Sequence, residues 1–395
     1  MTMRRGACPT LSAPMRTGDG LLARIAPAHG ALTPEKLTGI ARAARRHGNG
    51  ILEVTARGKL QIRGLTAESA PLFATEINAL DLGPVDGFAV ETAPLAPPPS
   101  LAERVDAHVA ERGYAALLAP KVSVTVDCGG ALNLDAISAD IKLIMADGGQ
   151  WLIGVGGNGA TAHWLGAGDE RVAGDRALAI LDLLAQTGGR ARDFTQAEKN
   201  ALQAGLAPAK THAPRADAAP VGSFTMAGGE STLGIAMPFG QISAEALVAL
   251  CEAVSDASEI RLAPRHGLLL LGLDEARHEE VFRAAHALGF VTKGDDPRLS
   301  IAACAGAPAC ASARFDAKAL AAEAAAAGLP DGPFRLHLSA CEKGCAQPAG
   351  PVVNLIAVEG GCTLSSVGAE PSERLRTFLI ERGETLRAAL LRKSG

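Results

Sequence analysis

Thr232-Leu233-Gly234-Ile235-Ala236-Met237-Pro238, in the second half of the chain, has the same pattern as Leu21-Leu22-Ala23-Arg24-Ile25-Ala26-Pro27 near the start. Both stretches are apolar runs of strand length that end at a proline. A helix start follows each of them, with Thr33 and Ser243 as good N-cap residues. Each predicted helix is followed by two apolar runs that predict a strand pair. The two copies of this unit span residues 20–65 and 231–273.

A second unit is also present twice, downstream of the first. Residues 120–128 parallel residues 333–341, and residues 141–149 parallel residues 353–361. Alternating and β-branched residues predict strands here, and the Asp-Gly-Gly and Glu-Gly-Gly sequences predict hairpin turns. The chain is therefore expected to be a duplicated pair of α/β units. Between the copies, residues 204–221 are rich in alanine and proline, which predicts an extended linker.

Four of the eight cysteines form two closely spaced pairs. Cys304 and Cys310 enclose a loop of small residues, whereas Cys341 and Cys345 would share one face if Cys341 opened a helical turn. Four thiolates that converge on one point can hold an iron–sulfur cube, and they can also hold zinc. Zinc-binding pairs usually have two residues between the cysteines, so the spacings of five and three residues favour an iron–sulfur cluster.

The remaining cysteines have no nearby thiol partner and are expected to be small buried hydrophobic residues. They are Cys8, Cys128, Cys251 and Cys362. Residues 1–15 carry charges but no apolar run, so they do not resemble a secretion signal. We therefore expect reduced thiols and a cytoplasmic location.

The composition argues against several functional classes. With 395 residues the chain is long enough for two or more domains, and 48% hydrophobic with 20% charged residues indicates a globular protein. The longest apolar runs, such as residues 268–273, are too short to cross a bilayer. A formal net charge of −4, one tyrosine and two tryptophans argue against nucleic-acid binding.

The cysteine spacing and the duplicated units together resemble the nitrite/sulfite reductase superfamily over nearly the whole chain. The resemblance implies an α+β fold with two ferredoxin-like half-domains, paired by pseudo-twofold symmetry, and two α/β domains of the cluster- and macrocycle-binding type. It also implies that four cysteines hold a [4Fe–4S] cluster and that the last of them faces the macrocycle. These ligands would be Cys304, Cys310, Cys341 and Cys345.

On this resemblance the chain divides into five segments. The first half-domain is expected at residues 1–98, an α/β domain without a cluster at 99–200 and a linker at 201–226. The second half-domain is expected at 227–296 and the cluster-binding α/β domain at 297–395. Of the cluster cysteines the first copy keeps only Cys128, so this copy is expected to have lost its metal.

Three stretches narrow the resemblance to one oxygen-dependent branch of the superfamily: residues 5–9, 15–20 and 55–65. This resemblance implies a monooxygenase of aerobic cobalamin biosynthesis that hydroxylates the tetrapyrrole precorrin-3A at a ring carbon and closes a lactone with an acetate arm. It further implies dioxygen as co-substrate, an NADH-linked or ferredoxin-like electron donor, and an additional mononuclear non-haem iron. The sequence shows no clear set of two histidines and one carboxylate for that iron.

The charged residues bear on an alternative function, that of a sirohaem-dependent nitrite or sulfite reductase. Such reductases place several cations over the sirohaem, yet residues 91–95 carry no arginine, and Ser123 stands where a companion of Lys121 is expected. A site with few cations is poorly suited to an oxyanion, so sirohaem is the less favoured cofactor. A third hypothesis is a non-catalytic cluster protein that senses iron or carries electrons. The size of the chain argues against this hypothesis.

Several cations remain for a substrate with many carboxylates. Arg57 and Arg265 stand at matched turns of the two copies. We expect four cations to bind the carboxylate arms of the tetrapyrrole: Arg57, Arg63, Lys121 and Arg265. No catalytic acid or base is predicted, and His337, which lies between two leucines, is expected to be structural.

Overall fold

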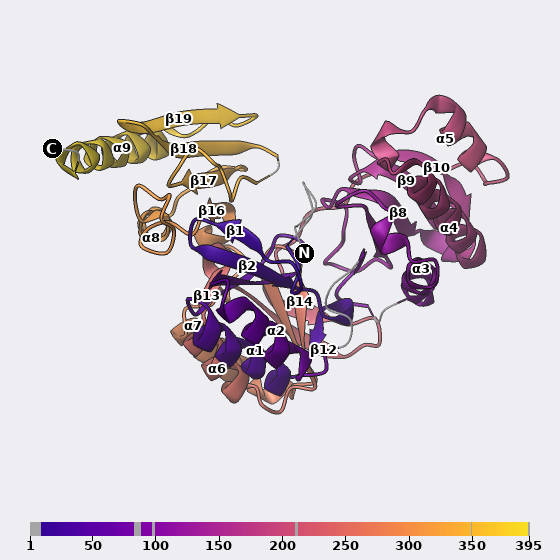
Figure 1. Ribbon diagram of the computed structural model, residues 1–395, viewed down its shortest axis with the longest axis horizontal. Helices are drawn as coiled ribbons and strands as arrows, with labels where there is room; N and C mark the ends of the chain where they lie inside the picture. The colour runs from indigo at the N-terminus through magenta and orange to yellow at the C-terminus, as the bar shows by residue number, and fades with distance from the viewer. Residues whose placement is uncertain (1–8, 83–87, 97–98, 210–211, 349, 394–395) are drawn as a thin grey trace.

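The computed structural model describes residues 9–82, 88–96, 99–209, 212–348 and 350–393. The N-terminal run at residues 5–9 and Cys8 therefore lie almost wholly outside the described residues. The fold is α+β and contains four sheets, each with helices packed against it (Figure 1). Within the described ranges, no helix has both the length and the apolar character that a membrane span requires.

Two five-stranded antiparallel sheets correspond to the two copies of the first repeated unit. The first sheet has the order β1 (Met15–Thr17), β2 (Gly20–Ile25), β5 (Leu60–Leu65), β4 (Ile51–Val54) and β13 (Gln241–Ser243). The third sheet has the order β11 (Gly222–Thr225), β12 (Ser231–Ala236), β15 (Gly267–Leu271), β14 (Glu259–Ala263) and β3 (Ala31–Leu32). The predicted strand pairs are confirmed in both copies.

The two sheets exchange their last strands. β3 comes from the first copy but pairs with β14 of the second, and β13 comes from the second copy but pairs with β4 of the first. Each of these strands is only two or three residues long. The exchange is reciprocal, so each sheet is completed by the other copy.

The helices of this paired unit pack side by side beneath the sheets (Figure 1). They are α1 (Pro34–His47), α2 (Ser69–Asn78), α6 (Ala244–Ala253) and α7 (His278–Ala287). The predicted N-caps are confirmed, because Thr33 Oγ1 accepts from Lys36 N and Ser243 Oγ accepts from Ala246 N. Apolar residues of both copies form one continuous core, which removes their side chains from water and stabilises the pairing.

The second repeated unit forms two mixed sheets. The second sheet has the order β10 (His163–Gly168), β9 (Trp151–Gly157), β8 (Ala139–Met145), β7 (Ser123–Asp127) and β6 (Ala89–Thr92), with helices α3 (Ser100–Glu111), α4 (Glu170–Thr187) and α5 (Gln196–Gln203). The fourth has the order β16 (Ile301–Ala303), β17 (Arg335–Ser339), β18 (Val352–Val358) and β19 (Gly361–Val367), with α8 (Ala317–Ala326) and α9 (Glu373–Lys393). Both contain three parallel strands followed by an antiparallel hairpin.

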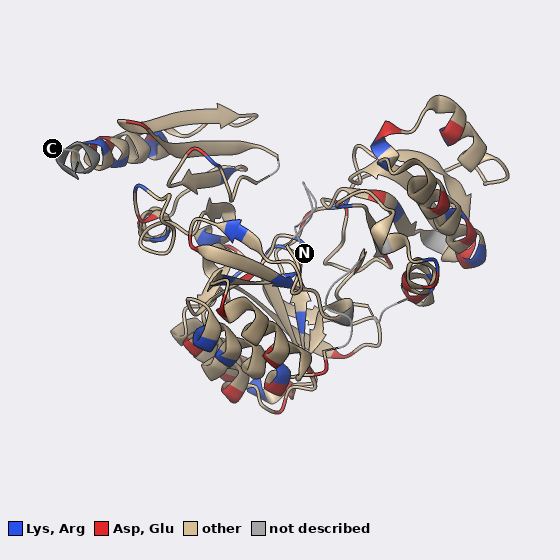
Figure 2. Ribbon diagram, viewed as in Figure 1, with Lys and Arg blue, Asp and Glu red and all other residues tan. Residues whose placement is uncertain are grey.

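Short 3-10 helices connect several of these elements. They lie at Ala28–Gly30, Tyr114–Ala116, Asp147–Gly149, Ala191–Asp193, Pro238–Gly240, Glu275–Arg277 and Pro297–Ser300. The Asp-Gly-Gly and Glu-Gly-Gly sequences form the predicted hairpin turns, between β8 and β9 and between β18 and β19. Basic and acidic side chains alternate along α4 and α9, as expected for helices with one face in solvent (Figure 2).

Two strands belong to a different sheet or segment from the one that the predicted boundaries imply. β6 lies within the segment assigned to the first half-domain, but it pairs with β7 in the second sheet. β11 lies within the segment assigned to the linker, but it is the edge strand of the third sheet. Residues 212–221 of the predicted linker contain no helix or strand, and they are anchored because Arg215 forms ion pairs with Asp127 and Asp135. The five boundaries themselves stay a prediction.

Strand pairing also corrects the alignment of the two α/β copies by one residue. Thr125 faces Glu91 on one side and Lys142 on the other. In the second copy His337 faces Ala302 and Asn354 in the same way. Residues 141–149 match residues 353–361, so these pairings place Thr125 of β7 at the position of His337 of β17. Cys128 therefore matches Ala340 and not Cys341, as the sequence comparison suggested.

Candidate functional site

The two cysteine pairs begin at the carboxyl ends of adjacent parallel strands. Cys304 directly follows β16, and Cys341 lies two residues after the end of β17. The two segments are held together because Cys304 N donates to Leu338 O at 3.2 Å and Ala340 N donates to Cys304 Sγ at 3.3 Å. The carboxyl ends of parallel strands are where ligands of open α/β sheets commonly bind.

The loop from Cys304 to Cys310 lies against the first half-domain. Cys310 N donates to Gly306 O within the loop, and the next residue, Ala311, donates from its N to Gly18 O at 2.8 Å. Gly18 lies in the turn between β1 and β2. A Cβ atom at this position would overlap Cys310 Sγ, so the close approach requires glycine.

The segment from Cys341 to Cys345 is a turn and not the helical turn considered above. Gly344 has a φ of 60°, in the left-handed region, and Gln347 N donates to its carbonyl at 3.0 Å. Partial burial raises the pKa of the Cys345 thiol, and the negative charges of neighbouring Cys341, Cys304 and Cys310 raise it further. The four predicted ligands are thus electrostatic neighbours, and their thiolates would repel one another without a cation between them.

The spacing of these sulfurs bears on the kind of metal centre. Within the described part of the chain, no three His, Cys, Asp or Glu side chains converge closely enough to hold one metal ion. A [4Fe–4S] cube takes one thiolate on each of its four irons, so its ligands stand further apart than those of a single ion. Neighbouring thiols that form no such centre are compatible with a cube. Among the described residues, the predicted mononuclear iron has no ligand set.

Two cations lie beside the cysteines. Arg63 donates from Nε and Nη2 to the Asp19 carboxylate at 2.6 and 2.9 Å, and its positive charge lowers the pKa of Cys345. Burial opposes the charge on Asp19, but its hydrogen bonds from Arg63 and Thr17 leave its pKa lowered. The structure thus places the predicted Arg63 next to the cysteines, engaged with an acidic partner.

The second cation is Lys318, which the sequence did not single out. Its Nζ donates to Phe239 O at 2.9 Å and Ala303 O at 3.1 Å, and it lies 5.6 Å from the centre of the Phe239 ring. Burial lowers the pKa of Lys318 to about 8, whereas the charges of Glu53 and Cys304 act in the opposite direction. Lys318 is the second residue of α8, and it gave no signal in the sequence because lysines near a helix start are usually solvated.

The other predicted substrate-binding cations lie in different settings. Arg57 donates to both carboxylate oxygens of Glu91 and, at 3.1 Å, to Ser123 Oγ, so its guanidinium is engaged within the protein. Lys121 is exposed just before β7 and has a φ of 68°. Arg265 donates to the Asp217 carbonyl at 2.6 Å.

Two further lysines in the first copy were not anticipated. Lys142 is fully buried on β8 and donates to Thr125 Oγ1, Leu134 O and Ile137 O at 3.3, 3.0 and 2.9 Å. Burial lowers its pKa to about 8. Burial also lowers the pKa of Lys59, while the nearby Glu91 carboxylate raises it. The sequence did contain a signal for the burial of Lys142, because this lysine stands between the apolar residues Ile141 and Leu143.

The predicted structural role of His337 has geometric support. The residue is buried on β17, and its Nδ1 lies 2.9 Å from Asn354 Oδ1, whereas Nε2 has no hydrogen-bond partner. Burial lowers its pKa, so the neutral imidazole is favoured.

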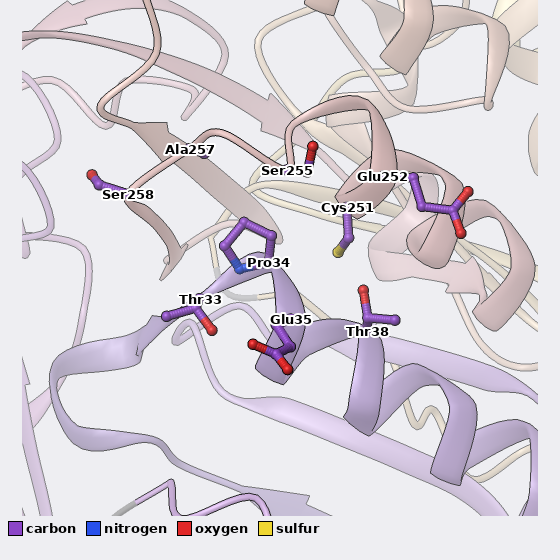
Figure 3. A pocket seen from close by; sticks show the side chains of 9 residues that line it. All are labelled: Thr33, Pro34, Glu35, Thr38, Cys251, Glu252, Ser255, Ala257 and Ser258. Carbon is purple, nitrogen blue, oxygen red and sulfur yellow. The ribbon is translucent and has the colours of Figure 1, made fainter.

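A cavity of about 360 Å³ opens between the start of α1 and the end of α6, away from the cysteine pairs (Figure 3). It is lined by Thr33, Pro34, Glu35, Thr38, Cys251, Glu252, Ser255, Ala257 and Ser258. Cys251 is buried and its thiol pKa is raised to about 11 by burial, so it is a packing residue as predicted. The cavity contains none of the predicted site residues.

Comparison with known proteins places this geometry in a family. A model of the nitrite/sulfite reductase ferredoxin-like half domain matches twice, at residues 13–80 and 225–288, which coincide with the first and third sheets and their helices. A precorrin-3B synthase from Sinorhizobium sp is 38% identical over 388 residues, covering 93% of this chain and 84% of that protein.

The chain belongs to the precorrin-3B synthase family.

The fold of this family member is that of the nitrite/sulfite reductases. The Mycobacterium tuberculosis NirA protein matches it with a TM-score of 0.67 over 89% of this chain and 76% of that chain, at 16% identity. The predicted resemblance and the duplicated α+β architecture are thereby confirmed. A relationship at this low identity concerns the fold alone and carries no ligand from NirA to this chain.

Proposed function

We propose that this protein converts precorrin-3A to precorrin-3B as an oxygen-dependent monooxygenase that carries a [4Fe–4S] cluster. The observation that supports this most strongly is the 38% identity to a precorrin-3B synthase across 93% of the chain. In the proposed reaction, one atom of dioxygen enters the hydroxyl group on the ring carbon and the other leaves as water. Two electrons come from an NADH-linked or ferredoxin-like donor, and an acetate arm closes the lactone.

The proposed cluster ligands are Cys304, Cys310, Cys341 and Cys345. When bound, a [4Fe–4S] cluster supplies electrons to a reaction one at a time. Mutual repulsion between the four thiolates supports the assignment, since the raised pKa of Cys345 is relieved once metal neutralises the group. The described cysteines are all free thiols, which supports a reducing compartment such as the cytoplasm.

Residues around the cysteines have supporting roles in this proposal. Gly18 leaves room for Cys310, and the Arg63–Asp19 pair fixes the same turn beside Cys345. Lys318 contributes a positive charge near Cys304. We propose that Lys121 and Arg265 contact carboxylate arms of the tetrapyrrole, and that Arg57 and Arg63 help through the acidic residues they hold in place.

A sirohaem-dependent nitrite or sulfite reductase is the alternative. Fold similarity to NirA is compatible with it, but residues 91–95, where an arginine was expected, carry none, and the Glu91 carboxylate pairs with Arg57. The proposed monooxygenase does not require a strongly cationic pocket.

Anaerobic purification and reconstitution with iron and sulfide test the cofactor. Iron and sulfide near four per chain, with an EPR signal after reduction, is the expected result for a [4Fe–4S] protein. Cys345→Ser should lower both contents, whereas the matched control Cys362→Ser should not. A strong red-region absorption band from sirohaem, or zinc in place of iron, would overturn the cofactor assignment.

The reaction itself is tested with precorrin-3A, a chemical or protein reductant and ¹⁸O-labelled dioxygen. Mass spectrometry should find one labelled oxygen atom in the product only when dioxygen, reductant and the reconstituted protein are all present. Nitrite and sulfite are the matched alternative substrates under the same conditions. Turnover of either of them, with no change in precorrin-3A, would favour the reductase alternative.

A further inference from the structure

One charged contact in the first α/β copy has no direct counterpart in the second copy. In the first copy, Arg57 from the turn between β4 and β5 holds the carboxylate of Glu91 on β6, and Ser123 on β7 completes the contact. The matched turn between β14 and β15 carries Arg265 in the second copy. Because the strand registers coincide, Glu91 corresponds to Ala302 and Ser123 corresponds to Arg335.

The second copy therefore has an additional guanidinium but lacks the carboxylate. Ala302 ends at Cβ, so the carboxylate and the methylene group that carry the interaction in Glu91 have no counterpart. A small cavity of about 20 Å³, room for roughly one water-sized group, lies at this place. Its lining includes Arg265, Ala302 and Arg335.

The electrostatic balance at this cavity is positive. Arg298 also lines it, but Asp296 neutralises that residue through three hydrogen bonds of 2.7 to 3.1 Å. Burial lowers the pKa of Arg335, and the charge of Arg265 lowers it further, whereas Asp217 raises it. Burial is the largest cause of this lowering, and the two guanidinium groups share the single Asp217 carboxylate.

A carboxylate of the chain itself lies at this pair of arginines. Asp217, from the linker, has its Oδ2 atom 3.6 Å from Arg265 Nε and 3.5 Å from Arg335 Nη2. These ion-pair distances are longer than the 2.8 and 2.5 Å between Arg57 and Glu91, and the Asp217 side chain is 41% exposed. The Asp217 carboxylate therefore holds the position loosely, whereas the Asp217 carbonyl keeps a short hydrogen bond of 2.6 Å from Arg265.

We propose that Arg265 and Arg335 form a binding site for an external carboxylate, which takes the place that Glu91 occupies in the first copy. Asp217 acts as a weak internal competitor that leaves when the ligand binds. Two sources share this chemistry, a free small carboxylate and an acid arm of the tetrapyrrole. The site itself is independent of the proposed function, and only the second source rests on it.

Acetate is the probe, because its methyl and carboxylate groups match what Ala302 lacks relative to glutamate. Binding of ¹³C-labelled acetate to the full chain is measured by NMR titration at constant ionic strength, with chloride as the competing anion. Asp217→Asn should tighten acetate binding several-fold, and Arg335→Met should weaken it about tenfold, as expected for loss of one charge-assisted contact. Arg42→Met, on the exposed face of α1, is the matched control and should bind like the wild type.

A second variant keeps the test independent of folding defects. Ala302→Glu rebuilds the first copy's carboxylate in the second copy, so it should abolish acetate binding and raise the melting temperature. Equal acetate binding by the wild type, Arg335→Met and Ala302→Glu would overturn the proposal, as would the absence of any binding to both the wild type and Asp217→Asn.

The source of the carboxylate is separated with precorrin-3A. If an acid arm of the tetrapyrrole binds here, Arg335→Met should weaken precorrin-3A binding about tenfold, and acetate should compete with precorrin-3A. If a free carboxylate binds, precorrin-3A affinity should be the same in Arg335→Met and Arg42→Met, while acetate binding still differs. Loss of precorrin-3A binding in every protein would count against the proposed function and leave the acetate result unaffected.

Discussion

Arg57 contacts both carboxylate oxygens of Glu91, with N–O distances of 2.8 and 2.5 Å. Arg57 belongs to the first half-domain sheet and Glu91 to the second sheet, so the pair joins the two units. The Glu91 side chain is 6% exposed, whereas that of Arg57 is 39% exposed. The carboxylate thus accepts two charge-assisted hydrogen bonds from one guanidinium, and the buried Lys59 is a further cation near it.

Arg57→Ala should lower the free energy of unfolding by about 2–3 kcal/mol, because it removes both charge-assisted hydrogen bonds from the buried Glu91 carboxylate. Urea denaturation followed by circular dichroism measures this change. Adding Glu91→Gln to Arg57→Ala should recover part of the loss, since the amide carries no charge. A loss of less than 0.5 kcal/mol (roughly the effect of an ordinary surface substitution) would contradict the structural role of the pair.

Gly18→Ala should reduce the iron and sulfide content after reconstitution, because the new methyl group would overlap Cys310 Sγ and displace that thiol. Gly228→Ala is the matched control, since a Cβ at that glycine meets open space and its φ is not positive. Metal analysis and the EPR signal of the reduced protein provide the measurements. Equal cluster content in the two variants would show that Cys310 need not remain against this turn.

Lys318→Met should lower the reduction potential of the cluster by roughly tens of millivolts, because a nearby positive charge favours the more negative, reduced state. Redox titration monitored by EPR measures the potential of the reconstituted protein. Lys199→Met, on α5, serves as the control for loss of a lysine charge far from the cysteines. Identical potentials in the two variants would show that the charge of Lys318 does not act on the cluster.

Lys142 predicts a specific pH dependence of stability. Burial lowers its pKa from 10.5 to about 8 in the folded state, so below pH 8 the amine is protonated in both states. Between about pH 8 and 10.5 the unfolded state binds more protons at this site, and its contribution to the free energy of unfolding rises with pH.

The increase from Lys142 should be roughly 1–3 kcal/mol over this range. The measurement compares urea denaturation of the wild type and Lys142→Met at pH 7.5 and pH 10, and the difference between the two proteins isolates this residue. A wild-type advantage that stays constant or shrinks as the pH rises would contradict the lowered pKa.

Local patterns predicted much of this fold, and non-local pairing accounts for what they missed. Thr33 and Ser243 were recognisable as N-caps because capping depends on residues within one helical turn. The exchange of β3 and β13 was not predictable, since strands of two and three residues carry no periodicity and their partners lie in the other copy.

In the candidate site, too, local patterns were predictable and non-local contacts were not. The four cysteines were predicted from spacing, and the structure brings their segments to neighbouring strand ends. The arginines were harder, because Arg57 and Arg265 look alike in the sequence but differ in the partners that the other sheets supply. The one-residue shift that places Cys128 on Ala340 likewise depends on strand register, which sequence similarity over two short runs could not determine.

The reciprocal exchange of β3 and β13 has a consequence for the origin of the molecule. An ancestor with a single copy would have needed a second molecule to supply the missing strand, so it would have been a symmetric homodimer with two identical sites. Fusion of the two genes released these sites from the requirement to stay alike. One could then keep its thiols while the other lost them and acquired different polar contacts.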